Sequence, residues 1–154
     1  GEPAVGVVLD PILGDEFAAA LGHGATRNGT SITVSNTTVL SEALLATGFG
    51  YQPDRRRRQA EGLVEILPRV RDIRRMGGAA LDLASVACGR VDAFFERGLA
   101  PWDIAAGIVI VREAGGRVCD LSEGSPTGDL VVAAPEGILS ELLSLLRSSG
   151  ADRT

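Results

Sequence analysis

The residues with the greatest potential for chemistry lie in one segment, Glu96–Gly107. Pro101 is typical of the first turn of a helix, and from Ile104 onward the sequence is apolar almost all round, which indicates a buried helix. Asp103 therefore lies at the start of a buried helix, where a carboxylate is costly unless hydrogen bonds or a cation satisfy it. Two interpretations follow. Asp103 either accepts hydrogen bonds from first-turn N–H groups, or it faces a cavity and coordinates a hard cation.

A second carboxylate, Glu96, ends the strand that is expected to precede this helix. Because the end of a strand and the start of the next helix meet at one edge of an α/β sheet, Glu96 and Asp103 can share the mouth of a site. The alternative is a surface Glu96 paired with Arg97. The pair Gly77-Gly78 precedes another expected helix and either exposes backbone N–H groups to a ligand oxygen or forms an ordinary turn.

The composition excludes several other kinds of chemistry. The 154 residues include no lysine, one histidine and two cysteines, which rules out a Schiff-base lysine, a P-loop lysine and a zinc cluster. Carboxylates favour magnesium-type ions over zinc. The net charge of −5 argues against broad contact with nucleic-acid phosphates. With sparse cysteines and no apolar stretch long enough to span a bilayer, we expect a cytoplasmic protein that binds neither nucleic acid nor a membrane.

The elements that must position these residues alternate between strands and helices. Strands are expected at Ala4–Leu9, Glu16–Leu21, Ser31–Ser35, Leu44–Gly48, Asp72–Arg75, Val91–Glu96, Arg117–Leu121 and Leu130–Ala134, and helices at about Gln59–Leu67, Ala79–Cys88, Pro101–Ala114 and Glu136–Leu146. This alternation predicts a layered α/β domain. The polar segment Pro53–Arg58, with its run of four arginines, is expected to be a solvated loop or a helix start, and a role in steering an anionic substrate stays open.

Several motifs together resemble the inositol monophosphatase family of magnesium-dependent, lithium-sensitive sugar phosphatases. The resemblance rests on Pro-Trp-Asp-Ile-Ala-Ala-Gly at 101–107, followed by Glu-Ala-Gly-Gly at 113–116. Further matching segments, in the order of the family, are Gly-Ala-Thr-Arg-Asn-Gly at 24–29, Arg74–Asp82 and Asp92–Glu96. The resemblance implies an α/β fold, a layered α-β-α-β-α sugar-phosphatase-like sandwich with its N-terminal part missing.

The resemblance also implies a role for each candidate residue. Asp103 matches the catalytic aspartate that binds metal ions beside the substrate phosphate. Glu96 matches the carboxylate that accepts hydrogen bonds from a substrate hydroxyl. Gly77, Gly78 and Ala79 match the loop-to-helix segment that lines the substrate pocket with backbone groups.

The segment Asp10–Asp15 is similar to the family's metal motif Asp-Pro-Ile-Asp-Gly-Thr but differs from it where the chemistry matters. Leu13 replaces the second aspartate and cannot bind a metal, so we interpret Asp10 and Asp15 as turn residues. The true motif, and the glutamate pair that precedes it in the family, are expected upstream of Gly1. The chain is thus expected to hold the C-terminal portion of a single domain at 1–147, followed by a frayed tail at 148–154.

The activity that the resemblance implies is that of a phosphoric monoester hydrolase. It would hydrolyse inositol 1-phosphate or a similar sugar or polyol phosphate with Mg2+, would be inhibited by lithium, and would be a homodimer when full length. Histidinol phosphate, fructose bisphosphate and phosphoadenosine phosphate, on which relatives act, stay open as substrates. Since most metal ligands would lie upstream, the 154 residues alone are expected to be inactive. A non-catalytic or split half-domain that binds a partner chain is the alternative of a different class.

Overall fold

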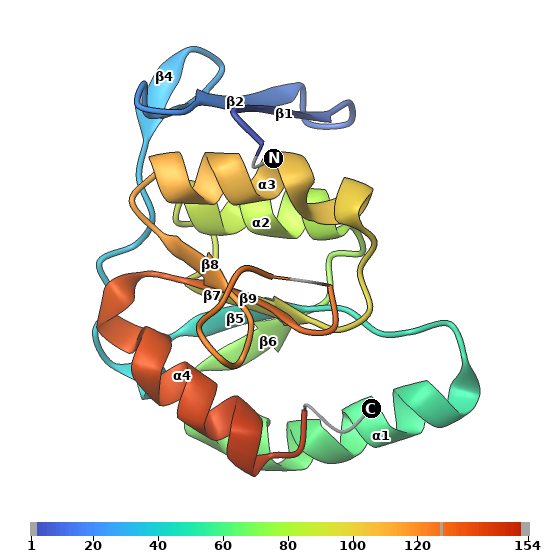
Figure 1. The fold of residues 1–154 in the computed structure, drawn as a ribbon. Coiled ribbons are helices and arrows are strands. Elements are labelled where there is room, and N and C mark those ends of the chain that lie inside the picture. The colour runs from blue at the N-terminus through green and yellow to red at the C-terminus, as the bar shows by residue number, and fades with distance from the viewer. Residues whose placement is uncertain (1–2, 127, 152–154) are drawn as a thin grey trace.

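Four layers make up the computed structural model, which describes residues 3–126 and 128–151 (Figure 1). The first layer is an antiparallel sheet of β1 (Val5–Asp10), β2 (Asp15–Ala20), β3 (Ala25–Arg27) and β4 (Thr30–Ile32), paired in that order. Beneath it lie the helices α2 (Ala79–Ala87) and α3 (Pro101–Glu113). The expected layered α/β fold is confirmed.

The third layer is a mixed sheet in the order β6-β5-β7-β9-β8. Its strands are β5 (Leu44–Thr47), β6 (Asp72–Arg74), β7 (Ala93–Glu96), β8 (Arg117–Cys119) and β9 (Val131–Ala134). β5 runs parallel to β6 and β7, and β9 runs antiparallel to β7 and β8. The fourth layer holds α1 (Pro53–Ile66) and α4 (Glu136–Ser148), and single 3-10 turns lie at Leu40–Glu42 and Leu67–Arg69.

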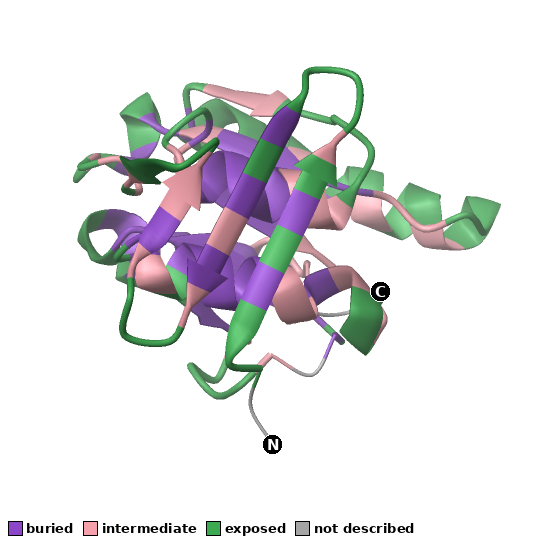
Figure 2. Cartoon of the chain, turned by 90° about the horizontal axis from the view of Figure 1, so that it is seen from above, coloured by how far each residue is buried: buried purple, intermediate pink, exposed green. Residues whose placement is uncertain are grey.

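The outer face of the first sheet is uncovered within the described residues. The side chains of Val5, Val7 and Leu9 are 66%, 57% and 59% exposed, whereas Gly6 and Val8 between them are buried against the helices. Figure 2 shows this alternation along β1 from above. Alternation of this kind places one face of a strand on a core and the other outside it. Here both faces are apolar, so β1 exposes an apolar stripe.

Two apolar cores lie on the two sides of the mixed sheet. The upper core joins the inner face of the first sheet to α2 and α3, and includes Phe17, Leu83 and Ile110. The lower core lies under α1 and α4 and includes Ile66 and Leu142. None of the helices within the described residues combines the length and apolarity needed to cross a membrane.

Several predicted boundaries are wrong. Helix α1 begins at Pro53 rather than Gln59, because Pro53 suits the first turn and Asp54 carries a favourable negative charge there. Residues 25–27, which lie in none of the expected strands, form the strand β3. The strand expected at 31–35 ends at Ile32, since the N–H of Val34 donates to the carbonyl of Ala114 instead of to a neighbouring strand.

The frayed tail expected at 148–154 is corrected in part. Helix α4 continues through Ser148, and the Ala151 side chain packs against the lower core. The N–H of Ala151 also donates to the carbonyl of Leu146 at 3.2 Å. The structured part therefore extends to residue 151, and residues 152–154 lie outside the described residues.

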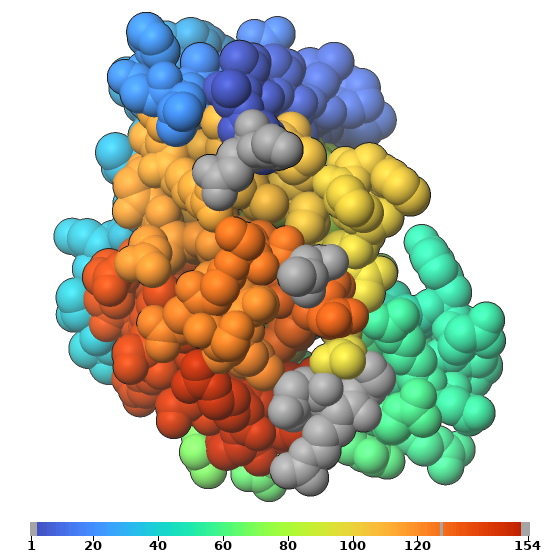
Figure 3. All heavy atoms as spheres, in the orientation of Figure 1, coloured from blue at the N-terminus to red at the C-terminus, as the bar shows by residue number. Residues whose placement is uncertain are grey.

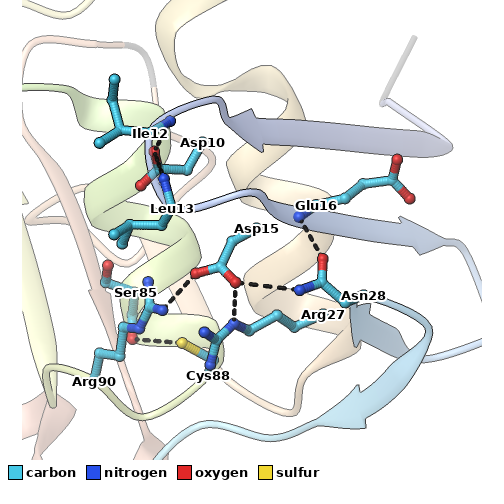
Figure 4. Close-up of polar contacts among 10 residues, drawn as sticks. All are labelled: Asp10, Ile12, Leu13, Asp15, Glu16, Arg27, Asn28, Ser85, Cys88 and Arg90. Carbon is cyan, nitrogen blue, oxygen red and sulfur yellow. Dashed lines mark hydrogen bonds and ion pairs between the residues drawn. The ribbon is translucent and has the colours of Figure 1, made fainter.

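Asp15 is a buried ion-pair residue rather than the expected turn residue (Figure 4). Its carboxylate is 2% exposed and accepts hydrogen bonds from Arg27 at 2.8 Å and Arg90 at 2.5 Å. The hydrogen bond from Arg27 is the largest cause that holds the pKa of Asp15 below its usual value. The pairing joins β2 and β3 to the turn after α2. Asp10 does fit its prediction, since its side chain accepts the N–H groups of Ile12 and Leu13.

Candidate active site

A pocket of about 260 Å3 lies where α1, the start of α2 and the start of α3 meet the end of β7. In Figure 3 the yellow start of α3 and the green α1 flank an indentation on this face. All five residues singled out from the sequence line it: Gly77, Gly78, Ala79, Glu96 and Asp103. The topology thus brings together residues that the chain separates by up to 26 positions.

Asp103 occupies the third position of α3. Its Oδ2 accepts the N–H of Ala100 at 2.9 Å, which satisfies a donor just ahead of the helix. This hydrogen bond gives Asp103 the capping role that its position allowed. The cap uses one carboxylate oxygen, and the side chain also lines the pocket. Capping and cation binding by Asp103 are therefore compatible.

Glu96 ends β7 and reaches over the end of the neighbouring strand β5. A Cβ built at Gly48 would overlap the Glu96 carboxylate, so the absence of a side chain at Gly48 makes room for it. Glu96 is half-buried. Burial raises its pKa, Arg75 opposes that rise, and the charge of Asp103 adds to it. A carboxylate in such a site is an acceptor well suited to a hydroxyl donor.

The start of α2 presents backbone donors to the same pocket. Gly78 is its N-cap and has no side chain to bond the free N–H groups of the first turn. No atom lies within 4 Å of a Cβ built at Gly78, so this side of the helix start is open. Gly77 has a φ of +112°, in the region that favours glycine. A helix start of this kind attracts ligand oxygens.

Asp82 is a buried carboxylate close enough to the pocket residue Glu96 to feel its charge, and it was not predicted from the sequence. It lies one turn into α2, is 0% exposed, and neither of its carboxylate oxygens has a hydrogen-bond partner within the described residues. Burial raises the pKa of Asp82 to about 7, the charge of Glu96 adds to the rise, and Arg75 opposes it. The available signal was an aspartate in the first turn of a helix that is otherwise small and apolar.

Arginine side chains also line the pocket and were not predicted there. They are Arg55, from the run at the start of α1, and Arg75 and Arg97, from the segments next to Gly77 and Glu96. Arg55 and Arg75 both lower the pKa of Glu96 through their charge. The pocket thus offers carboxylates, guanidinium groups and helix-start N–H groups, which suit a polar, negatively charged ligand.

The described residues do not by themselves make a complete metal centre. No group of three or more His, Cys, Asp or Glu side chains within residues 3–126 and 128–151 could hold a metal ion. Asp103 can provide one hard oxygen ligand, whereas magnesium binding needs several. Cys88 and Cys119 are free thiols.

The layered fold and this pocket define a sandwich of the sugar-phosphatase type. The profile of the inositol monophosphatase family matches residues 1–151. The chain therefore belongs to the inositol monophosphatase family.

Known relatives extend the comparison over almost the whole chain. The inositol-1-monophosphatase SuhB of Mycobacterium tuberculosis is 44% identical over 152 residues, which are 96% of this chain and 52% of the relative. The Nus factor SuhB of Pasteurella multocida is 44% identical over 156 residues, 99% of this chain and 58% of the relative. The solved Thermotoga maritima IMPase superposes with a TM-score of 0.90 at 34% identity, over 100% of this chain and 59% of that structure. The chain thus spans a little over half the length of these relatives.

Proposed function

We propose that this chain is the C-terminal portion, residues 1–147 with a short extension, of a phosphoric monoester hydrolase. The enzyme would use Mg2+ to hydrolyse inositol 1-phosphate or a similar sugar or polyol phosphate. The observation that carries this proposal is the convergence of Asp103, Glu96 and the open start of α2 on one pocket. Membership of the inositol monophosphatase family supports it.

Each element of the pocket has a role in the proposed reaction. Asp103 would provide one carboxylate oxygen to Mg2+, and the bound ion would activate a water molecule and stabilise the leaving oxygen. Glu96 would accept a hydrogen bond from a hydroxyl of the alcohol part. The N–H groups at Gly78 and Ala79 would orient oxygens of the substrate, aided by the positive end of the α2 dipole.

The remaining metal ligands would come from residues upstream of Gly1 in a longer protein. Two observations support this. The described residues include no group of three or more His, Cys, Asp or Glu side chains that could hold a metal ion, and the M. tuberculosis relative is nearly twice as long. The exposed stripe of Val5, Val7 and Leu9 is the face against which an upstream helical layer would pack, completing the expected five-layer sandwich.

The test uses two proteins. The purified 154-residue chain should release no phosphate from inositol 1-phosphate with Mg2+, because the metal site lacks its other ligands. The coding sequence immediately upstream should contain an in-frame Asp-Pro-x-Asp-Gly-Thr motif, and the protein that includes it should be active and inhibited by lithium. Robust activity of the 154-residue chain would overturn the proposal that most metal ligands lie upstream of Gly1. An inactive longer protein would overturn the enzymatic function.

A split or non-catalytic half-domain that binds a partner chain is the second candidate, and the exposed apolar face of β1 is the observation that favours it. A start codon immediately before the Gly1 codon would support this candidate, since no upstream portion would then exist on the same chain. The resemblance to the family supports a homodimeric, cytoplasmic longer protein. Light scattering after size-exclusion chromatography would test the dimer.

A further inference from the structure

Arg55 lines the pocket, and the proposed reaction gives it no role. It lies in the first turn of α1, which belongs to the outer helix layer, whereas Asp103 and Gly78 belong to the inner helix layer (Figure 1). Arg55 therefore approaches the pocket from the opposite wall. Its Nε is buried and has no hydrogen-bond partner within the described residues. A buried donor without a partner is costly, which suggests that a ligand completes it.

Two glycines form the slot that holds the Arg55 side chain. A Cβ built at Gly50 would lie 2.5 Å from Cδ of Arg55, and one built at Gly98 would lie 2.6 Å from its Cζ. A side chain at either position would displace the guanidinium group. Gly98 also has a φ of +77°, which independently favours glycine. The backbone on both sides thus leaves this wall of the pocket to Arg55.

The loop that leads into α1 is fixed by its own hydrogen bonds. The N–H of Gly50 donates to Oε1 of Gln59 at 2.9 Å, and Nη1 of Arg56 donates to the carbonyl of Tyr51 at 2.7 Å. Arg57 and Arg58 are exposed, whereas Arg55 is half-buried. Of the four arginines in the run, Arg55 is the one that lines the pocket. The fold therefore places Arg55 in the pocket, whereas Arg57 and Arg58 lie on the surface.

The positive charge of Arg55 lies in the same pocket as the carboxylate of Glu96. Glu96 is half-buried, and the charge of Arg55 lowers its pKa without a direct ion pair between them in the structure. A guanidinium group offers coplanar N–H donors that match the oxygens of a phosphate or carboxylate. Because Arg55 lines the pocket, its guanidinium group can take a second group of this chemistry, apart from the phosphate that would lie near Asp103.

We propose that Arg55 is a specificity-determining residue that binds a second anionic group of the substrate. The pocket would then favour phosphate esters whose alcohol part carries a further phosphate or carboxylate. This rests on the proposed function, because it places the scissile phosphate at the end of the pocket formed by Asp103 and the start of α2.

Binding to the 154-residue chain tests the proposal without catalysis. Isothermal titration would compare inositol 1-phosphate with an inositol bisphosphate, and glycerol 2-phosphate with 2-phosphoglycerate. In each pair, the ligand with a second anionic group should bind at least about 10-fold more tightly, and Arg55→Gln should remove most of that difference, since hydrogen bonds to charged groups have this strength. Preference in the first pair alone identifies a phosphate as the second group, and preference in both pairs admits a carboxylate.

Two controls separate the local role of Arg55 from general effects. Arg58→Gln removes an exposed charge from the same helix and should leave the preference unchanged. Gly98→Ala should reduce the preference as Arg55→Gln does, because the added Cβ displaces the guanidinium. A melting curve for each variant checks folding, and Arg55→Lys, which keeps the charge but not the planar donors, should give an intermediate preference.

Three results would overturn the proposal. The first is equal affinity of the wild-type chain for ligands with one and with two anionic groups. The second is an Arg55→Gln variant that loses the same affinity for both ligands of a pair. The third is an Arg58→Gln variant that loses the preference as Arg55→Gln does. Phosphatase activity of the longer protein is measured separately. If that protein hydrolyses no phosphate ester, the proposed function fails while the titration still decides whether Arg55 binds the second anionic group. If it is active, Arg55→Gln should raise KM about 10- to 100-fold for the bisphosphate and less than about 3-fold for the monophosphate.

Discussion

At the scale of single residues, Asp103 caps α3 and is free to take the metal-binding role that we propose for it, two roles that the sequence left as alternatives. One carboxylate oxygen accepts the N–H of Ala100, and the side chain still lines the pocket. A first-turn aspartate is therefore held in a fixed orientation by the helix that it caps. The fixed orientation is what a metal ligand needs, because preorganised oxygens lose less freedom when an ion binds.

Asp103→Asn should separate these duties in the longer protein. The asparagine amide oxygen can still accept the Ala100 N–H, so the melting temperature should change by no more than about 2 °C. Loss of the negative ligand should lower kcat at a fixed Mg2+ concentration by about 100-fold or more. Rates measured across a Mg2+ titration check this, with the exposed Asp129→Asn as control. An unchanged Mg2+ dependence would mean that Asp103 is only a cap.

Asp82 makes the stability of the 154-residue chain depend on pH in an uncommon direction. The pKa of its buried carboxyl is raised from 3.8 to about 7, so the folded chain holds a proton that the unfolded chain has already released in this range. Stability should therefore fall as pH rises from about 4 to 7, and the loss should be complete above pH 7. The size of this loss is at most about 4 kcal/mol.

Asp82→Asn removes the titrating group and should flatten this part of the stability profile. Urea unfolding between pH 4 and pH 8 would measure the free energy of unfolding at each pH. The free energy of unfolding of the variant should exceed that of the wild type by the largest amount at pH 8. Asp54→Asn, at an exposed position, should keep the wild-type slope. If Asp82→Asn and the wild type differ by a constant amount at every pH, the buried carboxyl does not hold the proton.

At the scale of elements, the inner helix layer sets the geometry of the site. The start of α2 carries the free N–H groups and the start of α3 carries Asp103, so the two helices must keep one relative position. Gly107 allows their close approach, because a Cβ there would lie 2.5 Å from Cδ1 and 2.7 Å from Cβ of Leu83. Gly6 does the same for β1 against α3, where a Cβ would lie 2.5 Å from the carbonyl oxygen of Ala106.

Gly107→Ala should destabilise the chain by about 1–3 kcal/mol through overpacking, although alanine favours the helix itself. Chemical denaturation measures the change. Leu83→Ala alone leaves a cavity, but combined with Gly107→Ala it should cost less than the sum of the two single changes, because the added methyl group enters the vacated space. Additive effects would show that the two positions do not compete for the same volume.

Element α1 shows which local signal decided between two predictions. The run of arginines was expected to be a loop or a helix start, and the structure shows the helix start; the boundary at Gln59 was placed too late because a polar stretch lacks apolar periodicity. The decisive local signals were Pro53 and Asp54 in the first turn. The early start of α1 matters for the site, because it places Arg55 on a helix beside the pocket.

At the scale of the whole molecule, the uncovered stripe on β1 should govern association. The 154-residue chain should self-associate through this face, since packing the exposed apolar side chains against a second copy removes them from water. Val7→Lys should reduce the association, and sedimentation velocity over a range of concentrations measures it. Val64→Lys, at a single exposed valine on α1, is the matched control and should have no effect. Unchanged sedimentation of Val7→Lys would exclude this face as the cause.

The sequence by itself determined the fold class, the order of nearly all strands and helices, and five of the residues that line the pocket. It could do so because these features depend on apolar periodicity, on turn residues and on motifs that are continuous in the chain. The family followed from the same motifs and is confirmed. The capping bond of Asp103 was also among the two interpretations that its position allowed.

Only the tertiary structure decided which charged groups meet. Asp15 was expected in a turn, yet Arg27 and Arg90 converge on it from β3 and from the turn after α2. Arg55 lines the pocket, and Asp82 lies close enough to Glu96 to feel its charge. The packing of α1 and α2 buries polar atoms of both side chains that have no hydrogen-bond partner within the described residues. The physical reason is that burial and charge pairing depend on residues that are far apart in the chain. A local sequence pattern does not show which of these residues come into contact in the folded protein.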